Sequence, residues 1–322
     1  RTAAGQSIVG QANNDIRDIS ASADADRLAV VDSDFVTTVV DTTGPGPLAS
    51  LGSAWRPALS LISPDGRFVA ARLDSFVPAV FDIESSNLTA AHSGHASYVT
   101  AIAIAPNSGR IASAGWDGEI RIWSPSTGQL LFTIAHGERP TELSFHPNGE
   151  SLAVGDGLGR ITLYDAQSGA ARQSLDGHAD PVDSIAWSAD GRRLASGNTT
   201  GNIALYEDDG GNIVPRFELS GHTTSANSIV FTSDAQRLLS FSRGGLRVWN
   251  TSTGEEIVAL TDPAERAETA ISLSSGDDLL SSRGRHLRRW TPAPWDSISA
   301  ANDPPTAFQQ FRSSALSSTQ AR

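Results

Sequence analysis

Three residues of the types used in acyl transfer stand near one another in the chain: His95, Ser113 and Asp117. A serine hydroxyl, an imidazole base and an orienting carboxylate form the nucleophilic triad of many hydrolases. No G-x-S-x-G elbow, H-E-x-x-H helix, phosphate-binding loop or G-x-G-x-x-G motif accompanies them. What these residues do therefore depends on the elements that position them.

Metal and redox chemistry find little support in the composition. The chain has no cysteine, which excludes disulfides, thiolate nucleophiles and cysteine-bound zinc. Three of its histidines, His92, His146 and His286, are too scattered to suggest a metal site. We therefore expect no metal, no other cofactor and no catalytic residue, so that the protein is not an enzyme.

Charge and hydropathy limit the partners. The net charge of −12 opposes binding to a nucleic-acid backbone or an anionic membrane. No apolar run approaches the ~20 residues of a membrane span, and no signal peptide opens the chain. A protein or peptide partner is favoured, and a cytoplasmic location is slightly favoured. Because methionine is absent even at position 1, we expect the chain to be part of a longer product.

A turn rich in Asp, Asn, Gly and Ser, followed by a short apolar strand, occurs seven times. The first aliphatic residue of each strand serves as an anchor, and successive anchors lie 41 to 44 residues apart. This period matches a four-stranded propeller blade of about 40–45 residues. The anchors are Leu28, Val69, Ile111, Leu152, Leu194, Leu238 and Leu279.

Two further features recur with the same phase. A later strand in each copy ends in a pair such as Trp123-Ser124 or Tyr164-Asp165. Gly-His pairs end at His95, His178 and His222, 27 or 28 residues before the aromatic of the strand end, and the fourth copy has His136-Gly137 in reverse order. Over about residues 6 to 290 the chain resembles the WD-repeat family, and bacterial WD-repeat domains in particular.

The period and the resemblance predict an all-β fold. We expect residues 1–290 to form a seven-bladed β-propeller of four-stranded antiparallel blades, monomeric as an isolated ring. The resemblance implies that residues 6–10 complete the last blade, which leaves no free sheet edge at the seam. Residues 291–322 fall outside the repeats and are expected to be a tail or linker.

The resemblance also offers a structural role for the triad-like residues. In the family pattern a buried network joins a histidine, a hydroxyl, an aspartate and an aromatic residue within one blade, and only the third repeat has all four. The residues expected in such networks are His95, Ser113, Asp117, Trp123, His178, Ser196, His222, Ser240 and Trp249.

The family's usual partner-binding face lies at one end of the ring, where loops enter the inner and third strands. The residues at those positions are Trp116, Tyr98, Arg56, Trp55, Asp74, Arg139, Pro181, Thr199 and Arg283. Trp116 lies in a tight turn, where an aromatic side chain is difficult to bury, and is the main candidate for an interface anchor. With Trp55, Arg56 and Tyr98 it predicts a patch across repeats 2 and 3. The alternative is that Trp116 lies flat over its own blade.

The leading functional hypothesis is a non-catalytic interaction or scaffolding module, for example the sensor domain of a larger signalling protein. Bacterial propellers resembling this one often follow a regulatory ATPase, a kinase or a caspase-like protease. The alternative is a small-ligand or enzymatic propeller with its site at the mouth of the central channel. The arginine-rich stretch at 283–289 could bind an acidic peptide, or could be an irregular final strand.

Overall fold

The computed structural model describes residues 5–11, 14–24, 26–42, 47–51, 57–73, 77–85, 87–91, 94–260, 269–272, 279–283 and 286–291. For residues 5–11, 57–59, 89–91 and from 260 onward, it describes the backbone of the strands and not the side chains. No helix in the described part of the chain is long and apolar enough to cross a membrane.

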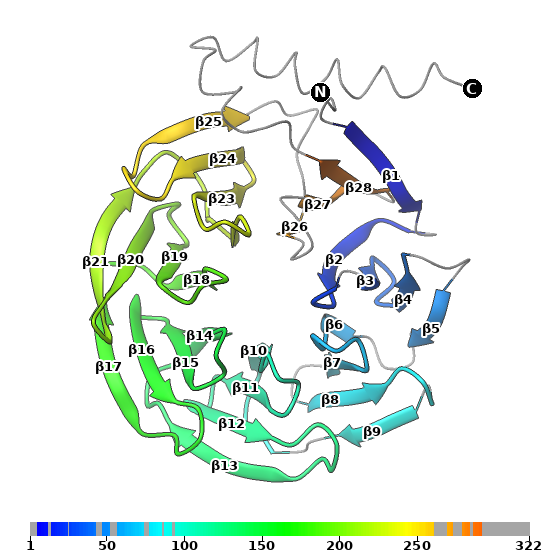
Figure 1. Cartoon of the computed structure of the whole chain (residues 1–322). Coiled ribbons are helices and arrows are strands. Elements are labelled where there is room, and N and C mark those ends of the chain that lie inside the picture. The colour runs from blue at the N-terminus through cyan, green and yellow to red at the C-terminus, as the bar shows by residue number, and fades with distance from the viewer. Residues whose placement is uncertain are drawn as a thin grey trace, which may run out of the picture.

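Six four-stranded sheets follow one another around a ring (Figure 1). Blades 1 to 3 contain β2 (Ile16–Ala21), β3 (Arg27–Asp32), β4 (Thr37–Asp41), β5 (Pro47–Leu51); β6 (Pro57–Ile62), β7 (Phe68–Leu73), β8 (Val77–Asp82), β9 (Asn87–Ala91); and β10 (Val99–Ile104), β11 (Ile111–Gly115), β12 (Glu119–Trp123), β13 (Leu130–Ala135). Blades 4 to 6 contain β14 (Pro140–Phe145), β15 (Ser151–Asp156), β16 (Arg160–Asp165), β17 (Ala171–Asp176); β18 (Val182–Trp187), β19 (Arg193–Asn198), β20 (Ile203–Asp209), β21 (Asn212–Leu219); and β22 (Ser228–Phe231), β23 (Arg237–Ser242), β24 (Gly245–Asn250), β25 (Glu256–Leu260).

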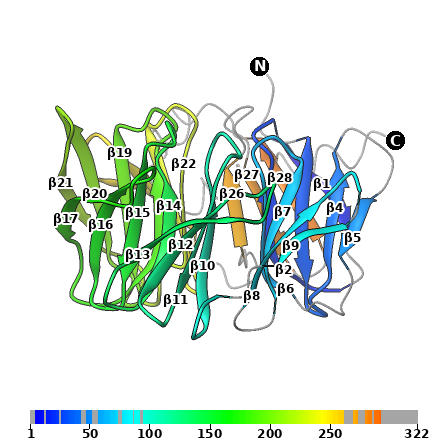
Figure 2. The ribbon, with the colours of Figure 1, turned by 90° about the horizontal axis from the view of Figure 1, so that it is seen from below.

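Within each blade the strands are antiparallel and in sequence order from the centre of the ring outward. The predicted anchors fall in the second strands, where Ile111 pairs with Ile104 of the first strand and Leu152 pairs with Phe145. The prediction of four-stranded antiparallel blades is therefore confirmed. Seen from the side, the sheets stand next to one another around the ring (Figure 2).

A further four-stranded sheet joins the two ends of the propeller sequence. It consists of β26 (Thr269–Ser272), β27 (Leu279–Arg283), β28 (His286–Thr291) and β1 (Gly5–Gln11). The backbone of β1 pairs antiparallel with that of β28, with Gln6 opposite Trp290. The side chains of this sheet lie outside those described.

The core lies between blades rather than inside one of them. Strand β11 is buried along its whole length. Its Ile111 packs towards blade 2 with Phe68, whereas Ala112 packs towards blade 4 with Leu143. Alternate residues of one strand thus contact opposite neighbours, which explains why these strands are apolar at successive positions.

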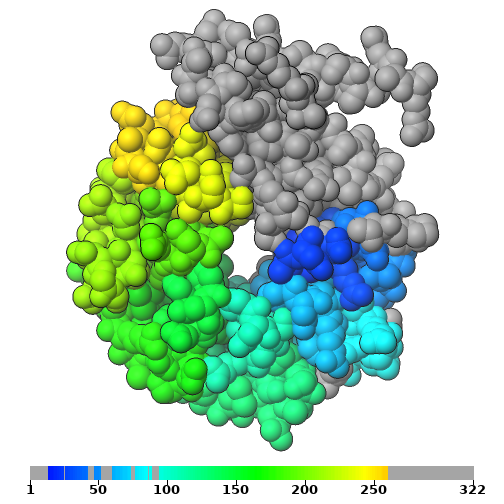
Figure 3. Space-filling model, in the orientation of Figure 1, coloured from blue at the N-terminus to red at the C-terminus, as the bar shows by residue number. Residues whose placement is uncertain are grey.

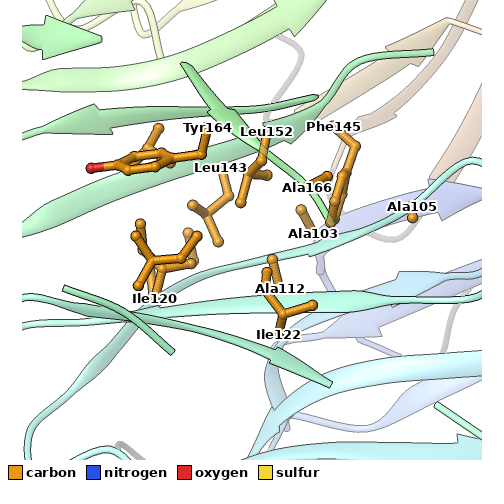
Figure 4. Close-up of a cluster of buried hydrophobic side chains, with 14 residues drawn as sticks. Ala103, Ala105, Ala112, Ile120, Ile122, Leu143, Phe145, Leu152, Tyr164 and Ala166 are labelled. Atoms are coloured by element: carbon orange, nitrogen blue, oxygen red, sulfur yellow. The ribbon is translucent and has the colours of Figure 1, made fainter. Parts of the chain in front are cut away.

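The interface of blades 3 and 4 shows the packing in detail (Figure 4). Ile120 and Ile122 of β12 lie against Leu143, Leu152 and Tyr164 of blade 4. The two isoleucines and Leu152 are completely buried, and each such side chain stabilises the fold by about 1.5–3 kcal/mol. This apolar layer fixes the position of blade 3 relative to blade 4, and therefore the positions of the surface loops of both blades.

Candidate partner-binding face

The four residues of the predicted network in blade 3 are in hydrogen-bonding contact. His95 Nδ1 lies 3.1 Å from both carboxylate oxygens of Asp117, and His95 Nε2 lies 2.8 Å from Ser113 Oγ. The Trp123 indole N–H donates to the same Oγ at 3.0 Å. Gly115 leaves room for this arrangement, because a Cβ at that position would come within 2.5 Å of His95 Nδ1.

This geometry suits a structural role better than a nucleophilic one. Ser113 is completely buried and His95 nearly so, so a substrate carbonyl cannot reach the serine Oγ. Partial burial raises the pKa of Asp117, but the hydrogen bond from His95 and backbone N–H donors outweigh it and hold that pKa below its usual value. Asp117 also accepts from the Ala96 N–H at 2.8 Å, which ties the β11–β12 turn to the loop before β10.

Blades 5 and 6 carry reduced forms of the network. His178 Nε2 lies 2.8 Å from Ser196 Oγ in blade 5. In blade 6, His222 Nε2 lies 2.7 Å from Ser240 Oγ, to which the Trp249 indole N–H donates at 2.9 Å. The place of the missing aspartate is taken by the Ser242 hydroxyl, 2.8 Å from His222 Nδ1, which the sequence analysis did not predict.

In blade 4 the histidine contacts different residues from those in blade 3. Its equivalent of Ser113 is Val154, which has no hydroxyl. His136 Nδ1 instead lies 2.8 Å from the Tyr164 hydroxyl, and its Nε2 lies 3.6 Å from Asp156. The reversed His136-Gly137 dipeptide therefore still supplies an imidazole to its blade, although sequence reasoning assigned it no contact.

Backbone hydrogen bonds bring the predicted face positions together in pairs. In three consecutive blades, the N–H of the turn after the second strand donates to a carbonyl of the loop before the first strand: Trp116 to Tyr98 at 2.9 Å, Gly157 to Arg139 at 3.0 Å, and Thr199 to Pro181 at 3.1 Å. Thr199 is exposed and Pro181 is half-buried. Each pair thus presents two neighbouring positions at the same end of its blade.

Tyr98, Trp116 and Arg139 form one cluster on this face. The rings of Tyr98 and Trp116 are tilted by 60°, with centroids 5.1 Å apart. The guanidinium carbon of Arg139 lies over the Trp116 ring, 5.3 Å from its centroid. Tyr98 is 46% exposed and Trp116 is 47% exposed. Trp116 therefore does not bury itself over its own blade.

Leu158 adds an apolar side chain that the sequence analysis overlooked. It lies in the β15–β16 turn, directly after Gly157, whose N–H is bonded to Arg139. At 56% it is the most exposed of the large hydrophobic side chains described. The available signal was an apolar residue at the turn position that Asp117 occupies in blade 3.

The cluster of Tyr98, Trp116 and Arg139 extends from blade 3 to blade 4. The part of the predicted patch on repeat 2 stays a prediction. Trp55, Arg56 and Asp74 lie outside the described residues, and so does the side chain of Arg283.

Two carboxyl groups on the inner strands are electrostatically unusual. Burial raises the pKa of Asp18, on β2, to about 7. Burial, followed by the charges of Asp183 and Asp18, raises the pKa of Glu142, on β14, to about 8. The inner strands surround an opening at the centre of the ring (Figure 3). Among the described residues, no group of three or more His, Asp and Glu side chains could hold a metal ion.

Family comparisons agree with this architecture. The family model described as "WD domain, G-beta repeat" matches residues 86–124, 169–207 and 213–250, and the model "Anaphase-promoting complex subunit 4 WD40 domain" matches residues 128–183. The matched segments run from β9 of blade 2 to β24 of blade 6 and include the histidine networks of blades 3 to 6. The chain belongs to the WD40-repeat β-propeller family.

Several curated proteins resemble this WD40 chain over part of its length. WD repeat-containing protein 90 of Mus musculus is 26% identical over 54% of the chain, and the periodic tryptophan protein 2 homolog of Schizosaccharomyces pombe is 25% identical over 49%. Coronin-7 of Mus musculus is 34% identical over 30% of the chain. The matched regions cover 9%, 21% and 12% of these relatives, respectively. WD40 propellers are typically scaffolds for protein interactions and are generally non-catalytic.

Proposed function

We propose that this WD40 propeller is a protein-interaction module that binds a protein or peptide partner through the surface of Tyr98, Trp116, Arg139 and Leu158, here called the aromatic–arginine patch. The observation that carries the proposal is the packing of the two exposed aromatic rings and the guanidinium, which come from two adjacent blades. Trp, Tyr and Arg are the residue types that contribute most to binding at protein interfaces.

The patch combines exposure with a rigid support. Each aromatic ring retains close to half of its accessible surface, which a partner can cover. The turn that carries Trp116 is fixed by hydrogen bonds, because the adjacent Asp117 contacts His95, which in turn contacts the buried Ser113. Little conformational freedom is therefore lost when the turn binds a partner. Because ordering a mobile segment costs binding free energy, a turn that is already rigid supports tighter binding.

The wider binding face includes the other predicted rim positions. Thr199 and Pro181 continue it into blade 5, and their backbone pairing repeats the one that links Trp116 to Tyr98. Trp55, Arg56, Asp74 and Arg283 are proposed as its continuation on the other side of the patch. A partner larger than a short peptide would contact several blades at once.

We also propose that residues 1–290 form a single seven-bladed ring, with residues 6–10 completing the last blade and residues 291–322 forming a tail or linker. The pairing of β1 with β28 and the seven anchors of the sequence support this layout. A closed ring leaves no sheet edge at the seam. A role as the sensor or recognition domain of a larger signalling protein fits the greater length of the relatives.

Capture of binding proteins from the source cell tests the proposal. The double variant Trp116→Ala/Tyr98→Ala should lose the captured partner, with a melting temperature close to that of the wild type, because both side chains are half exposed. The matched control is Leu130→Ala/Leu131→Ala on β13, the outer strand of the same blade, where the exposed fractions are 43% and 46%.

The control variant should retain the partner. Equal capture by wild type, Trp116→Ala/Tyr98→Ala and the outer-strand control would show that the face has been chosen wrongly. Loss of capture in the outer-strand control alone would move the interface to the edge of blade 3.

A further inference from the structure

Arg139 differs from other exposed arginines of blade 4 in its electrostatic surroundings. Arg160 contacts the carboxylate of Asp156 at 3.2 Å, and Arg172 is paired with Asp165. Arg139 is exposed and has no carboxylate partner among the described residues; its contact is with the Trp116 ring. Its positive charge is therefore available at the centre of the aromatic–arginine patch.

The position of the Arg139 guanidinium over the Trp116 ring favours recognition of an anionic group. A cation over an indole face is attracted by the ring electrons, and that contact uses none of the guanidinium N–H donors. Those donors match the two oxygens of one carboxylate in a bidentate arrangement. The Trp116 ring thereby limits the positions of Arg139, so less side-chain freedom is lost when an acceptor binds.

The neighbours of Arg139 determine what must flank that acceptor. Tyr98 and Trp116 offer apolar ring surface on the blade 3 side, and Leu158 offers an exposed aliphatic side chain on the blade 4 side. A ligand that carried only a charge would leave this apolar surface in water. A ligand with a large apolar side chain next to its charge would cover it.

We propose that the aromatic–arginine patch recognises an extended peptide segment of a partner protein in which an Asp or Glu stands beside a large apolar side chain. The carboxylate binds Arg139, and the apolar side chain packs against Trp116, Tyr98 or Leu158. This inference rests on the proposed function, because it names the chemistry of the partner at the same surface.

Charge favours a carboxylate over a phosphate in this site. A phosphorylated side chain carries close to two negative charges and is usually bound by several arginines. In the described part of the patch Arg139 is the single cation, and Arg160 nearby is already paired with Asp156. The chain as a whole carries a net charge of −12, which adds repulsion for each further negative charge on the ligand.

A peptide selection tests the proposal directly. A phage-displayed library of random linear peptides is selected on the full chain, and phage that also bind the Trp116→Ala/Tyr98→Ala variant are removed. The expected result is enrichment of peptides with Asp or Glu next to a large apolar residue. A selected peptide is then synthesised in three forms, with the acid, with its amide (Asn or Gln), and with phosphoserine at that position.

Binding of these peptides to wild type and to Arg139→Gln completes a double-mutant cycle. The acid-to-amide change should weaken binding to the wild type about 10-fold and should have little effect on Arg139→Gln. Arg139→Lys should recover part of the affinity, because lysine keeps the charge and loses the bidentate geometry.

Three results would overturn the inference. The first is enrichment of peptides without an acidic residue, and the second is an acid-to-amide effect that persists unchanged in Arg139→Gln. The third is tighter binding of the phosphoserine form that depends on Arg139. In each case a peptide still binds through Trp116 and Tyr98, so the proposed function stands. Failure to select any peptide that distinguishes wild type from Trp116→Ala/Tyr98→Ala would count against the inference, and the capture experiment would then decide the fate of the proposed function.

Discussion

Gln173 and Ile213 are joined by two hydrogen bonds, although they belong to the outer strands of different blades. The Gln173 side-chain N–H donates to the Ile213 carbonyl at 2.7 Å, and its Oε1 accepts from the Ile213 N–H at 3.0 Å. Strand β21, with eight residues, continues to a hairpin tip at Gly210 and Gly211, both with positive φ. Strands β17 and β21 run side by side at the outer edge of the ring (Figures 1 and 2). The Gln173 side-chain amide thus pairs with the backbone of β21 as a neighbouring strand would.

Replacing Gln173 with alanine should destabilise the propeller by about 1–2 kcal/mol, because the N–H and C=O of the buried Ile213 lose their partners. The measurement is urea-induced unfolding followed by circular dichroism. Gln167→Ala is the control, since Gln167 is an exposed residue in the turn between β16 and β17 of the same blade. A Gln173→Ala variant as stable as Gln167→Ala would show that the two hydrogen bonds contribute nothing measurable.

The histidine networks should behave as structural units. Ser113→Ala should lower the free energy of unfolding by about 2–4 kcal/mol, because the buried His95 Nε2 and the Trp123 indole N–H both lose their common partner. Ser240→Ala should cost a similar amount, since Ser240 joins His222 and an indole N–H in the same way. A Ser113→Ala variant with unchanged thermal stability would argue against the structural role.

Two tyrosines at equivalent positions of neighbouring blades give a matched comparison. The Tyr164 hydroxyl lies 2.8 Å from His136 Nδ1, whereas the buried Tyr206 hydroxyl, close to the Ser196 side chain, forms no well-aligned hydrogen bond with a described residue. Tyr164→Phe should therefore cost about 1–2 kcal/mol, and Tyr206→Phe should be neutral or slightly stabilising. Differential scanning calorimetry of both variants measures the contrast. Equal losses would mean that the Tyr206 hydroxyl finds a partner in solution.

The propeller could be predicted from the sequence because each blade requires buried apolar residues at the same positions, and these residues recur with a fixed period. Leu152 and Leu194 recur at one phase since each sits completely buried in the second strand of its blade. Trp116 was recognisable as an exposed aromatic because a tight turn between Gly115 and Asp117 offers no cover. Positions set by the repeat were therefore predictable from one sequence.

Contacts that the repeat does not specify were missed. In blade 6 the Ser242 hydroxyl contacts His222 Nδ1, the position that an aspartate contacts in blade 3. In blade 4 the long Tyr164 side chain brings its hydroxyl to His136, in place of the serine hydroxyl of blade 3. The contact of Arg139 with Trp116 crosses from one blade to the next. Such contacts depend on side-chain reach and on the spacing of blades, which the spacing of residues along the chain does not encode.

Glu142 should make stability fall as the pH rises. Its pKa in the folded protein is about 8, because burial and the charges of Asp183 and Asp18 oppose ionisation, whereas the unfolded chain ionises near 4.5. Between these values the folded state binds more protons than the unfolded state, so the free energy of unfolding decreases with pH until the folded carboxyl also ionises.

Glu142→Gln removes this titration. The variant should match the wild type near pH 4 and exceed it increasingly towards pH 8, by an amount on the order of a few kcal/mol, with no further gain above that pH. Urea unfolding at a series of pH values measures the difference, with the exposed Glu150→Gln as control. Parallel stability curves for Glu142→Gln and wild type would show that Glu142 ionises equally readily in both states. Because the pKa of Asp18 is raised from 3.8 to about 7, it gives a slope of the same sign between these two pH values, and the double variant Asp18→Asn/Glu142→Gln should have a flatter profile than either single variant.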